Sequence, residues 1–558
     1  MSKLSTPSAA VQALVRDGDA VHFSFTHNRS HVLAYEVARQ FAGRRSLSLI
    51  ATGLLDYAIV LEGVGALRDA SSAFAGMTYP AAGPSPPMQA LASRAGSDPD
   101  WTNLTATLRL MAGALGLPAI TTHALHGTGL EAGAGREMVD DPFGGPPIMM
   151  LAPLRADVAA LHVPVADTDG NALVQGPSGE DLWGVWGARR VIVSAELVVA
   201  PEELRTMAPG PGLPASRVDA VVHAPLGAHP QAQFVWDPRI PVEPYAEDYE
   251  FRDDLRRAAR TTDGLAAWLE RWVVGIDHDE YLERLGAARR RVLHANARRP
   301  IVAAPSTADR VSVSEAAAVN GVRWLRARLL DDPVAHRPLF AGIGLSHLVA
   351  FAAARHAERD GVPVQLVAEV GMMGFVPADG DPYLFSATNA STAVVHADFV
   401  RMLAAVGGRN ERGTIAVLAA GEIDRRGRLN SSRSSDGSFI VGSGGANDLA
   451  AGASELLVVV PLSPRRTVAE LPFVTAAPAH LRAVATDLGI LEPGEDGELS
   501  LVAVVADGPE EQQAAVDRAV AACGWPLRVA DEVERLPPAT AEEMAELRLL
   551  DPARRLLG

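Results

Sequence analysis

The chain has 558 residues, 48% of them hydrophobic, so we expect two large domains, each with its own core. Its 67 acidic residues outnumber the 50 basic ones, and the resulting formal charge of −17 disfavours nucleic acid as a partner. It has one cysteine, no apolar run near the roughly 20 residues that cross a bilayer, and no apolar segment typical of a signal peptide at its start, so we expect a cytoplasmic protein without membrane contact.

Two segments half a chain apart have nearly the same sequence. Residues 30–39 read Ser-His-Val-Leu-Ala-Tyr-Glu-Val-Ala-Arg, and residues 346–355 read Ser-His-Leu-Val-Ala-Phe-Ala-Ala-Ala-Arg. Each follows an apolar segment and a turn, which predicts a strand, a loop and a helix. A second pair, each a buried strand running into a glycine turn, lies at 159–171 and 415–428. Repeats separated by half the chain predict two copies of one fold.

Short apolar strands alternate with helical stretches in both halves. The strands are predicted at 190–199, 362–368, 414–418, 455–461 and 499–505. This alternation predicts an α/β protein with two tandem, open, mostly parallel Rossmann-like sheets that form a pseudo-duplication. Ligands bind such sheets at the carboxyl ends of the strands. We place the seam between the copies within 289–308, which divides the chain into domains 1–300 and 301–558.

Glu369 follows the predicted strand 362–368 and precedes a turn that contains Gly371 and Gly374. A carboxylate in this position is poorly solvated, and the glycines let a ligand approach the backbone, which suits a nucleophile. The alternative is a helix-terminal acid or a structural ion pair. Superposing the repeats places Gly53 at the corresponding point of the first copy. Because that copy folds without the acid, a functional role for Glu369 is favoured.

A second glycine-rich segment follows the apolar run 439–441 and reads Gly442-Ser443-Gly444-Gly445-Ala446-Asn447-Asp448-Leu449. After a strand, such a loop presents backbone N–H groups at the start of a helix, where they hold an anion or an oxyanion. A dinucleotide or phosphate loop is the alternative, but the G-x-G-x-x-G and GK[ST] patterns are missing. No metal is expected.

These two segments resemble those of a known family. Glu-Val-Gly-Met-Met-Gly, which begins at Glu369, resembles the Ser-Glu-Asn-Gly-x-x-Gly segment of family I CoA-transferases, with Val370 in place of the asparagine. The loop at 442–449 resembles the Gly-Gly-Ala-x-Asp-Leu loop of their second subunit. Further segments resemble the glutaconate CoA-transferase branch. Those at 420–430, 473–475 and 484–489 resemble its beta subunit, whereas those at 25–27, 116–118, 157–171, 218–220 and 227–230 resemble its alpha subunit.

The resemblance covers nearly the whole chain and implies the CoA-transferase type of fold with both subunits fused. It implies that CoA moves between an acyl-CoA and a free carboxylic acid by a ping-pong reaction, with Glu369 as the nucleophile and a glutamyl-CoA thioester as the intermediate. Coenzyme A enters as the substrate thioester, and both partners are small molecules.

The family also implies roles for neighbouring residues. Oxyanion stabilisation is expected from the backbone of Gly444 and Gly445, with Asn447 nearby. The CoA or substrate loop is expected to contain Gly371, Gly374, Gly442 and Ser443. The acyl-pocket candidates, in a segment that departs from the Gly-Gly-Phe of many alpha subunits, are Ser24, Phe25, Thr26, His27 and Arg29. His27 and Arg29 are candidates for binding a substrate carboxylate, and a packed or solvent-facing role is the alternative for each. For the CoA phosphates, the candidates are Arg401, Arg425 and Arg433.

Two alternatives stay open. One is an acyl-CoA hydrolase of the same fold, either a thioesterase or a ring-opening C–C hydrolase. Such a hydrolase would need a functional acid in the half that resembles the alpha subunit. There the chain offers only Asp98 and Asp100. The other is a non-catalytic ligand-sensing protein. The sequence does not identify the acyl donor, the acceptor or the oligomeric state. A homo-oligomer is one of the states that it leaves open.

Overall fold

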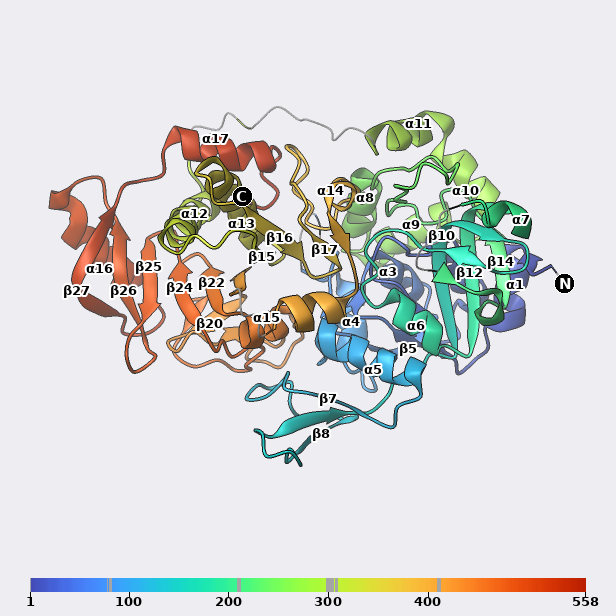
Figure 1. The fold of residues 1–558 in the computed structure, drawn as a ribbon, viewed down its shortest axis with the longest axis horizontal. Helices are drawn as coiled ribbons and strands as arrows, with labels where there is room; N and C mark the ends of the chain where they lie inside the picture. Colours follow the sequence, from blue (N-terminus) through green and yellow to red (C-terminus); the bar gives the residue numbers. More distant parts are fainter. Residues whose placement is uncertain are drawn as a thin grey trace.

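The computed structural model describes residues 2–77, 79, 83–207, 212–297, 306, 310–408 and 413–558. Within these residues, the first half forms a sheet in the order β1-β14-β12-β10-β2-β3-β5, with β11 and β13 attached beside β10 (Figure 1). All neighbours along that path are parallel. Its strands are β1 (Leu4–Ser5), β2 (Ala20–Phe23), β3 (Leu47–Ile50), β5 (Leu67–Ser71), β10 (Val158–Asp167), β11 (Ala172–Leu173), β12 (Arg190–Val199), β13 (Gly212–Leu213) and β14 (Ala220–His223).

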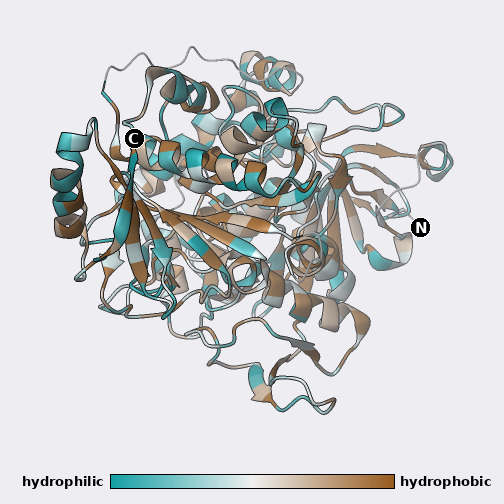
Figure 2. Ribbon diagram, turned by 60° about the vertical axis from the view of Figure 1, so that its left-hand side comes forward, coloured by the Kyte–Doolittle hydropathy of each residue, from teal (hydrophilic) through white to brown (hydrophobic). Residues whose placement is uncertain are grey.

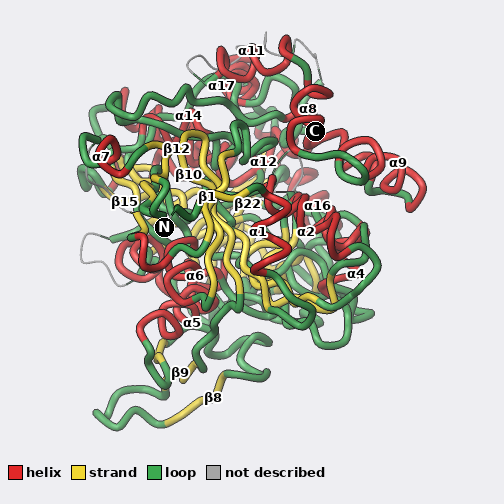
Figure 3. Tube along the Cα trace, turned by 90° about the vertical axis from the view of Figure 1, so that its right-hand side faces the viewer, coloured by secondary structure: helices red, strands yellow, loops and turns green. Residues whose placement is uncertain are grey.

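Helices lie around this sheet, some against its strands and others, such as α9, further out (Figure 3). They are α1 (Pro7–Leu14), α2 (His31–Phe41), α3 (Asp56–Gly63), α4 (Pro86–Ala92), α5 (Asn103–Leu115), α6 (Asp181–Gly187), α7 (Pro201–Leu204), α8 (Tyr249–Ala258), α9 (Thr262–Trp272), α10 (His278–Leu285) and α11 (Ala287–Asn296). A short pair joins β4 (Gly53–Leu54) to β6 (Phe74–Ala75). An antiparallel arm of β7 (Ile120–Thr122), β9 (Ile148–Leu151) and β8 (Arg136–Val139) projects away from both sheets (Figure 1).

The second half forms a sheet in the order β18-β17-β16-β15-β19-β22-β24-β25-β26-β27. Its strands are β15 (Arg337–Ala341), β16 (Val364–Ala368), β17 (Met372–Met373), β18 (Val395–His396), β19 (Ile415–Leu418), β22 (Glu455–Val459), β24 (Leu481–Ala485), β25 (Gly489–Pro493), β26 (Leu499–Val505) and β27 (Arg528–Leu536). Its helices are α12 (Val313–Asp331), α13 (Leu345–Arg359), α14 (Ala387–Thr392), α15 (Ala446–Gly452), α16 (Gln512–Ala522) and α17 (Ala541–Leu550). A small sheet joins β21 (Leu429–Asn430), β20 (Glu422–Asp424) and β23 (Thr467–Val468).

The duplication predicted from the sequence is confirmed by the strand order. The first sheet contains β14-β12-β10-β2-β3, and the second contains β24-β22-β19-β15-β16 in the same order and all parallel. Helices α2 and α13, which carry the repeated sequence, follow the corresponding strands β2 and β15. The second pair of repeated segments, 159–171 and 415–428, also has the same local structure. Asp167 and Asp424 each accept hydrogen bonds from backbone N–H groups of the glycine turn that follows.

The predicted strands also appear where the apolar runs placed them. The runs at 190–199 and 499–505 coincide with β12 and β26, and the other three contain β16, β19 and β22. Every residue of β10 is buried, because a parallel strand is covered by helices on both faces. Figure 2 shows the same distribution, with hydrophobic strands inside and hydrophilic residues concentrated on the outer helices. The predicted domain boundary at residue 300 lies outside the described residues and stays a prediction.

The two halves are joined by backbone contacts near the carboxyl ends of their strands. Phe74 forms an isolated antiparallel bridge with Gly442, and the Ala75 N–H donates to the carbonyl of Val441 at 2.9 Å. The Gly129 N–H donates to the carbonyl of Val474 at 2.8 Å. The halves therefore meet along a hydrogen-bonded seam. None of the described helices combines the length and the apolar character needed to cross a membrane.

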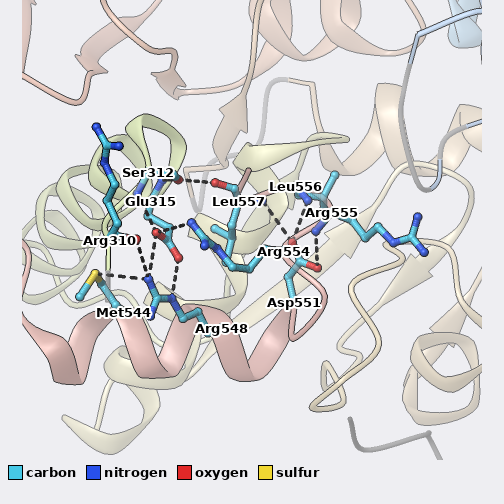
Figure 4. Close-up of polar contacts among 10 residues, drawn as sticks. All are labelled: Arg310, Ser312, Glu315, Met544, Arg548, Asp551, Arg554, Arg555, Leu556 and Leu557. Atoms are coloured by element: carbon cyan, nitrogen blue, oxygen red, sulfur yellow. Dashed lines mark hydrogen bonds and ion pairs between the residues drawn. The ribbon is translucent and has the colours of Figure 1, made fainter. Parts of the chain in front are cut away.

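The C-terminal segment is fastened to the start of α12 by a buried ion cluster (Figure 4). Glu315 is fully buried, and its carboxylate accepts hydrogen bonds from Arg548 Nε at 2.6 Å and from Arg554 Nη2 at 3.1 Å. Ser312, the N-cap of α12, donates its backbone N–H to the same carboxylate at 2.8 Å. The cluster holds α17 and the last residues against the second sheet's helices.

Candidate active site

Glu369 lies directly after β16, at the carboxyl end of a strand that pairs in parallel with β15, and is only 9% exposed. The next turn requires glycine: Gly371 has a φ of 118°, and a Cβ there would lie 2.0 Å from the carbonyl oxygen of Ala397. That carbonyl belongs to the residue after β18, which pairs with β17. The chain therefore folds tightly back beside Glu369, as the glycine turn predicted.

Two donors from opposite halves hold the carboxylate of Glu369. Asn103 Nδ2 donates to Glu369 Oε1 at 3.1 Å. The backbone N–H of Gly445 donates to the same carboxylate. The carboxylate sits so close to this loop that a Cβ added to Gly445 would lie 1.7 Å from Glu369 Oε2. The residue at position 445 must therefore be glycine for the carboxylate to keep this place.

Asn103 is held in place by the start of helix α5. Thr102 is the N-cap, and it forms a capping box with Thr105. Asp448 completes this helix start from the second half, accepting hydrogen bonds from Thr102 Oγ1 at 2.8 Å and from the Leu104 N–H at 3.3 Å. Glu369, which is hydrogen-bonded to Asn103 in the first turn of α5, therefore lies near the positive end of a helix dipole, which favours its negative charge.

The electrostatics of the site follow from its burial. Burial raises the pKa of Glu369 to about 7, although the hydrogen bonds from Asn103 and Gly445 act in the opposite direction. Burial and the nearby charge of Glu369 raise the pKa of Asp448 to about 8. Near neutral pH the site therefore holds an ionised or readily ionised Glu369 beside a protonated Asp448. A carboxylate that is weakly solvated at neutral pH is suited to nucleophilic attack.

The glycine loop departs from two expectations. The N–H of Gly444 donates to the carbonyl of Ala73 at 2.9 Å and is therefore not a free oxyanion donor. The side chain of Asn447 is also engaged, because its Oδ1 accepts from the Leu125 N–H at 3.3 Å and its Nδ2 donates to Thr475 O at 2.9 Å. Gly444 and Asn447 thus fix the loop at the seam, and the donor role falls to Gly445.

Two further glycines, one in the turn after Glu369 and one in the loop at 442–449, allow neighbouring segments to pack closely against the backbone. Gly442 has a φ of 90°, and a Cβ there would lie 2.5 Å from the carbonyl oxygen of Ala73. Gly374 has a φ of 71° and packs on Val394. Ser443 is buried, and its Oγ accepts from the N–H of Asn447 at 3.3 Å. Their predicted role as a CoA or substrate loop stays a prediction.

The acyl-pocket segment lies at the interface of the halves, and all five of its candidates are buried: Ser24, Phe25, Thr26, His27 and Arg29. The ring of Phe25 packs edge-on against Phe385 and Phe399 of the second half, with centroids 5.9 and 5.7 Å apart. It also fills the space beside Gly53, where a Cβ would lie 2.4 Å from the ring. The first copy therefore has no room for a side chain at the position that Glu369 occupies in the second.

Of the two roles considered for Arg29, the contacts in the structure fit the packed one, and a role in binding a substrate carboxylate stays a prediction. Arg29 Nη1 donates to Asp56 Oδ1 at 2.9 Å, and Arg29 Nη2 donates to the carbonyl of Phe25. His27 lies with its Nε2 3.6 Å from Glu247 Oε1, and neither ring nitrogen has a hydrogen-bond partner among the described residues. His27 thus stays a candidate for substrate contact, and Arg29 is engaged by Asp56 and the Phe25 carbonyl.

Several other candidates are engaged in ion pairs. Asp98 accepts two hydrogen bonds from Arg136 Nη2 at 3.0 Å and one from Trp101 Nε1 at 2.7 Å. Asp100 is paired with Arg433 across the seam. Two of the arginines proposed for CoA phosphates pair with nearby acids and remain over half exposed, namely Arg401 with Asp398 and Arg425 with Glu498.

Sequence reasoning missed Asn103 and assigned no role to Asp448. The pattern Thr102-Asn103-Leu104-Thr105 is a recognisable helix start, so it could have predicted the local structure. It gives no information on the contact with Glu369, which is 266 residues away. Among the described residues, no three His, Cys, Asp or Glu side chains are grouped so as to hold a metal ion.

Comparisons with known proteins agree with this architecture. Residues 4–224 match the family model described as Coenzyme A transferase. Over 196 residues the chain is 31% identical to one subunit of the glutaconate CoA-transferase of Acidaminococcus fermentans, a match that covers 32% of this chain and 59% of that protein. Over 236 residues it is 29% identical to one subunit of the 3-oxoadipate CoA-transferase of Pseudomonas knackmussii, with 38% and 85% covered.

The chain spans less than two thirds of the first two curated relatives it matches. It covers 63% of an uncharacterised protein of Archaeoglobus fulgidus, to which it is 28% identical, and 59% of the glutaconate CoA-transferase subunit. Among solved structures, an acyl-CoA transferase from Escherichia coli O157:H7, in a thioester complex with CoA, superposes with a TM-score of 0.65. That match covers 96% of this chain and 95% of the other at 15% identity, and so shows a shared fold.

Proposed function

We propose that the chain belongs to the coenzyme A transferase family and transfers CoA between an acyl-CoA and a free carboxylic acid, because residues 4–224 match that family model and the chain is similar to subunits of two different CoA-transferases. The observation that carries this proposal is the buried Glu369 carboxylate, held by Asn103 of one half and the backbone of Gly445 of the other.

The reaction begins with attack of the Glu369 carboxylate on the thioester carbonyl. The carbon–sulfur bond breaks, CoA leaves as the thiolate, and an acyl-glutamyl anhydride remains. The thiolate then attacks the glutamyl carbonyl and expels the acyl group as a free carboxylate, which leaves a glutamyl-CoA thioester. An incoming carboxylate reverses these two steps and departs as the new acyl-CoA, so Glu369 is regenerated and no water is consumed.

Asn103 and Gly445 have a consistent part in each step. In the free enzyme they hold the carboxylate with its oxygens fixed. Once Glu369 is acylated, the same two donors face its carbonyl oxygen and stabilise the negative charge that develops there during thiolate attack. A neutral Asp448 behind them limits the charge in the site to that of Glu369 itself. The geometry therefore suits two successive attacks at one carboxyl carbon.

The hydrolase alternative receives no support from the first half. Asp98 and Asp100, the acids considered for it, are bound by arginines. The group from this half that does reach Glu369 is an amide, Asn103, which cannot act as a general base for water. No observation on the described residues favours a purely ligand-sensing protein.

An acceptor assay tests the proposal. We expect CoA to pass from an acyl-CoA to acetate many times per enzyme molecule, and CoA release without an acceptor to be far slower. Glu369→Gln should abolish the transfer. Glu358→Gln, on the exposed side of α13, is the matched control and should keep it. Rapid multiple-turnover CoA release without any acceptor would contradict transferase activity.

A further inference from the structure

A buried leucine of the second half lies against the carboxylate of Glu369. Leu403 is 1% exposed and belongs to helix η2 (Val400–Val406). A Cβ added to Gly445 would lie 1.7 Å from Glu369 Oε2 and 3.1 Å from Leu403 Cδ2. Because both distances are measured from one point, the two atoms lie no farther apart than 1.7 and 3.1 Å taken together. A methyl group of Leu403 and the nucleophilic carboxylate therefore share one small space beside the loop.

Helix η2 has an uncommon geometry where it meets the nucleophile. It is a π-helix, in which backbone N–H groups bond to carbonyls five residues earlier. The N–H of Gly407, just after its end, donates in this way to the carbonyl of Met402 at 2.7 Å. π-Helical turns are rare and are found frequently at functional sites. This geometry beside Glu369 supports a functional role for the residues of η2.

Both ends of η2 are fixed to neighbouring segments. Before it, the N–H of Phe399 donates to the carbonyl of Gly179 in the first half at 3.0 Å. After it, Gly407 packs closely on the last residue of α15, because a Cβ added to Gly452 would lie 3.0 Å from the Gly407 carbonyl oxygen. The position of Leu403 is therefore set by contacts with both halves of the chain.

The charged groups near the carboxylate come from the glycine loop and from η2. The loop contributes Asp448, whose pKa is raised to about 8 by burial and by the charge of Glu369, so that it is protonated near neutral pH. Helix η2 contributes Arg401, which is mostly exposed and bound to Asp398. The start of α5 contributes the neutral amide of Asn103. Burial is the largest cause of the raised pKa of the nucleophile, so the exclusion of water dominates its environment.

Water in this space would divert the proposed reaction. In the glutamyl-CoA thioester, the carboxyl carbon of Glu369 is bound to the sulfur of CoA. A water molecule that attacks this carbon forms a carbon–oxygen bond and breaks the carbon–sulfur bond. CoA then leaves as the thiol, a proton goes to solvent, and Glu369 returns as a carboxylate without any acceptor receiving CoA. Closed active sites prevent such hydrolysis of reactive intermediates by excluding water.

We propose that Leu403 is a positioning residue that keeps water from the glutamyl-CoA thioester, so that CoA is transferred to an acid rather than released. Its apolar side chain fills the space beside the carboxyl group. Asn103 and the backbone of Gly445 meanwhile hold the oxygens. This inference rests on the proposed CoA transfer and adds the control of the competing hydrolysis.

The lifetime of the intermediate tests the inference. The protein is mixed with an acyl-CoA, freed of small molecules by gel filtration, and followed by intact-mass analysis while the bound thioester decays in buffer. Leu403→Ala opens space for water, and we expect its thioester to decay about tenfold faster or more than that of the wild type. Leu403→Val removes less of the side chain and should give a smaller change in the same direction. A wild-type lifetime in Leu403→Ala, or in Leu403→Val if the alanine variant does not fold, would overturn the inference.

Controls separate water exclusion from a general loss of packing. Leu403→Met keeps an apolar side chain of similar size and should keep the wild-type lifetime. Val406→Ala shortens a half-buried side chain of the same helix and should also leave the lifetime unchanged. In Leu403→Ala, the midpoint of the pH–rate profile should move from near 7 towards 4.5, because water favours the charged form of Glu369. Equal acceleration in Val406→Ala, or an unmoved midpoint in Leu403→Ala, would contradict the assigned role.

The proposed function and this inference fail in different ways. If the wild type forms the thioester and transfers CoA, but the Leu403 variants decay at the wild-type rate, the role of Leu403 is wrong and the CoA transfer stands. If the wild type forms no thioester and transfers no CoA, the proposed function itself fails, and this inference fails with it.

Discussion

Asn103 Nδ2 of the first half lies 3.1 Å from Glu369 Oε1 of the second, and the two residues are 266 positions apart in the chain. The nucleophile is therefore supplied by one copy of the fold and oriented by the other. Asp448 makes the reciprocal contact, because it lies on the second half and completes the start of helix α5. Fusing both halves in one chain keeps these contacts together independently of protein concentration.

Removing the side-chain donor at position 103 should weaken catalysis. We expect Asn103→Ala to lower the rate of CoA transfer by about 10²–10³-fold, the usual cost of losing one donor to a developing oxyanion. The same change removes a hydrogen bond that lowers the pKa of Glu369, so the pH–rate profile should move to higher pH. A merely structural role for Asn103 would lower the rate without this shift.

The pH dependence of the wild-type reaction should report the ionisation of Glu369. Burial raises its pKa to about 7, and only the carboxylate attacks the thioester. The value of kcat/KM for the acyl-CoA should therefore rise with pH through a midpoint near 7 and fall towards lower pH. A midpoint near pH 4.5, the ordinary value for a glutamate, would show that Glu369 is not desolvated in the free enzyme.

A methyl group at position 445 should displace the nucleophile. The Cβ of Gly445→Ala would lie 1.7 Å from Glu369 Oε2, so the carboxylate has to leave its position. We expect a loss of transfer of about 100-fold or more with a folded protein, since misplacing a catalytic group by about 1 Å has this effect. Gly83→Ala is the matched control, because its Cβ would meet nothing within 4 Å. Near-normal activity of Gly445→Ala would contradict the geometry described for this loop.

The buried cluster at the C-terminus should contribute strongly to stability. Arg548→Ala leaves the carboxylate of Glu315 buried with fewer partners, and breaking such a pair costs about 3–5 kcal/mol in free energy of unfolding. Arg528→Ala removes a half-exposed guanidinium that pairs with Asp496 and Glu498, and it should cost no more than about 1 kcal/mol. Chemical denaturation measures both values, and equal losses would show that Arg548 is not a structural clamp.

The parts of the fold that depend on local pattern could be predicted from the sequence. Apolar runs identified β12 and β26 at their observed bounds, and the repeated Ser-His segments identified α2 and α13. Glu369 could be selected because a carboxylate between a buried strand and a glycine turn is unusual. These signals lie within a few residues of one another in the chain.

Contacts across the seam could not be predicted in the same way. Nor could the packed role of Arg29 within the first half be chosen over substrate binding, because its burial beside Asp56 depends on how loop and helix pack. Gly444 has the same backbone donor as Gly445, and only the approach of Ala73 decides that the Gly445 N–H and not that of Gly444 serves Glu369. Asn103 has no unusual feature except its position at a helix start.

The most direct test of Glu369 as the nucleophile is the chemical identity of the trapped enzyme. The protein is incubated with an acyl-CoA, treated with hydroxylamine or borohydride, and digested for peptide mass mapping. We predict a single modification on the peptide that contains Glu369, absent in Glu369→Gln and present in Glu358→Gln. A modification at another residue, or full transfer activity without any modification of Glu369, would contradict the role assigned to this glutamate.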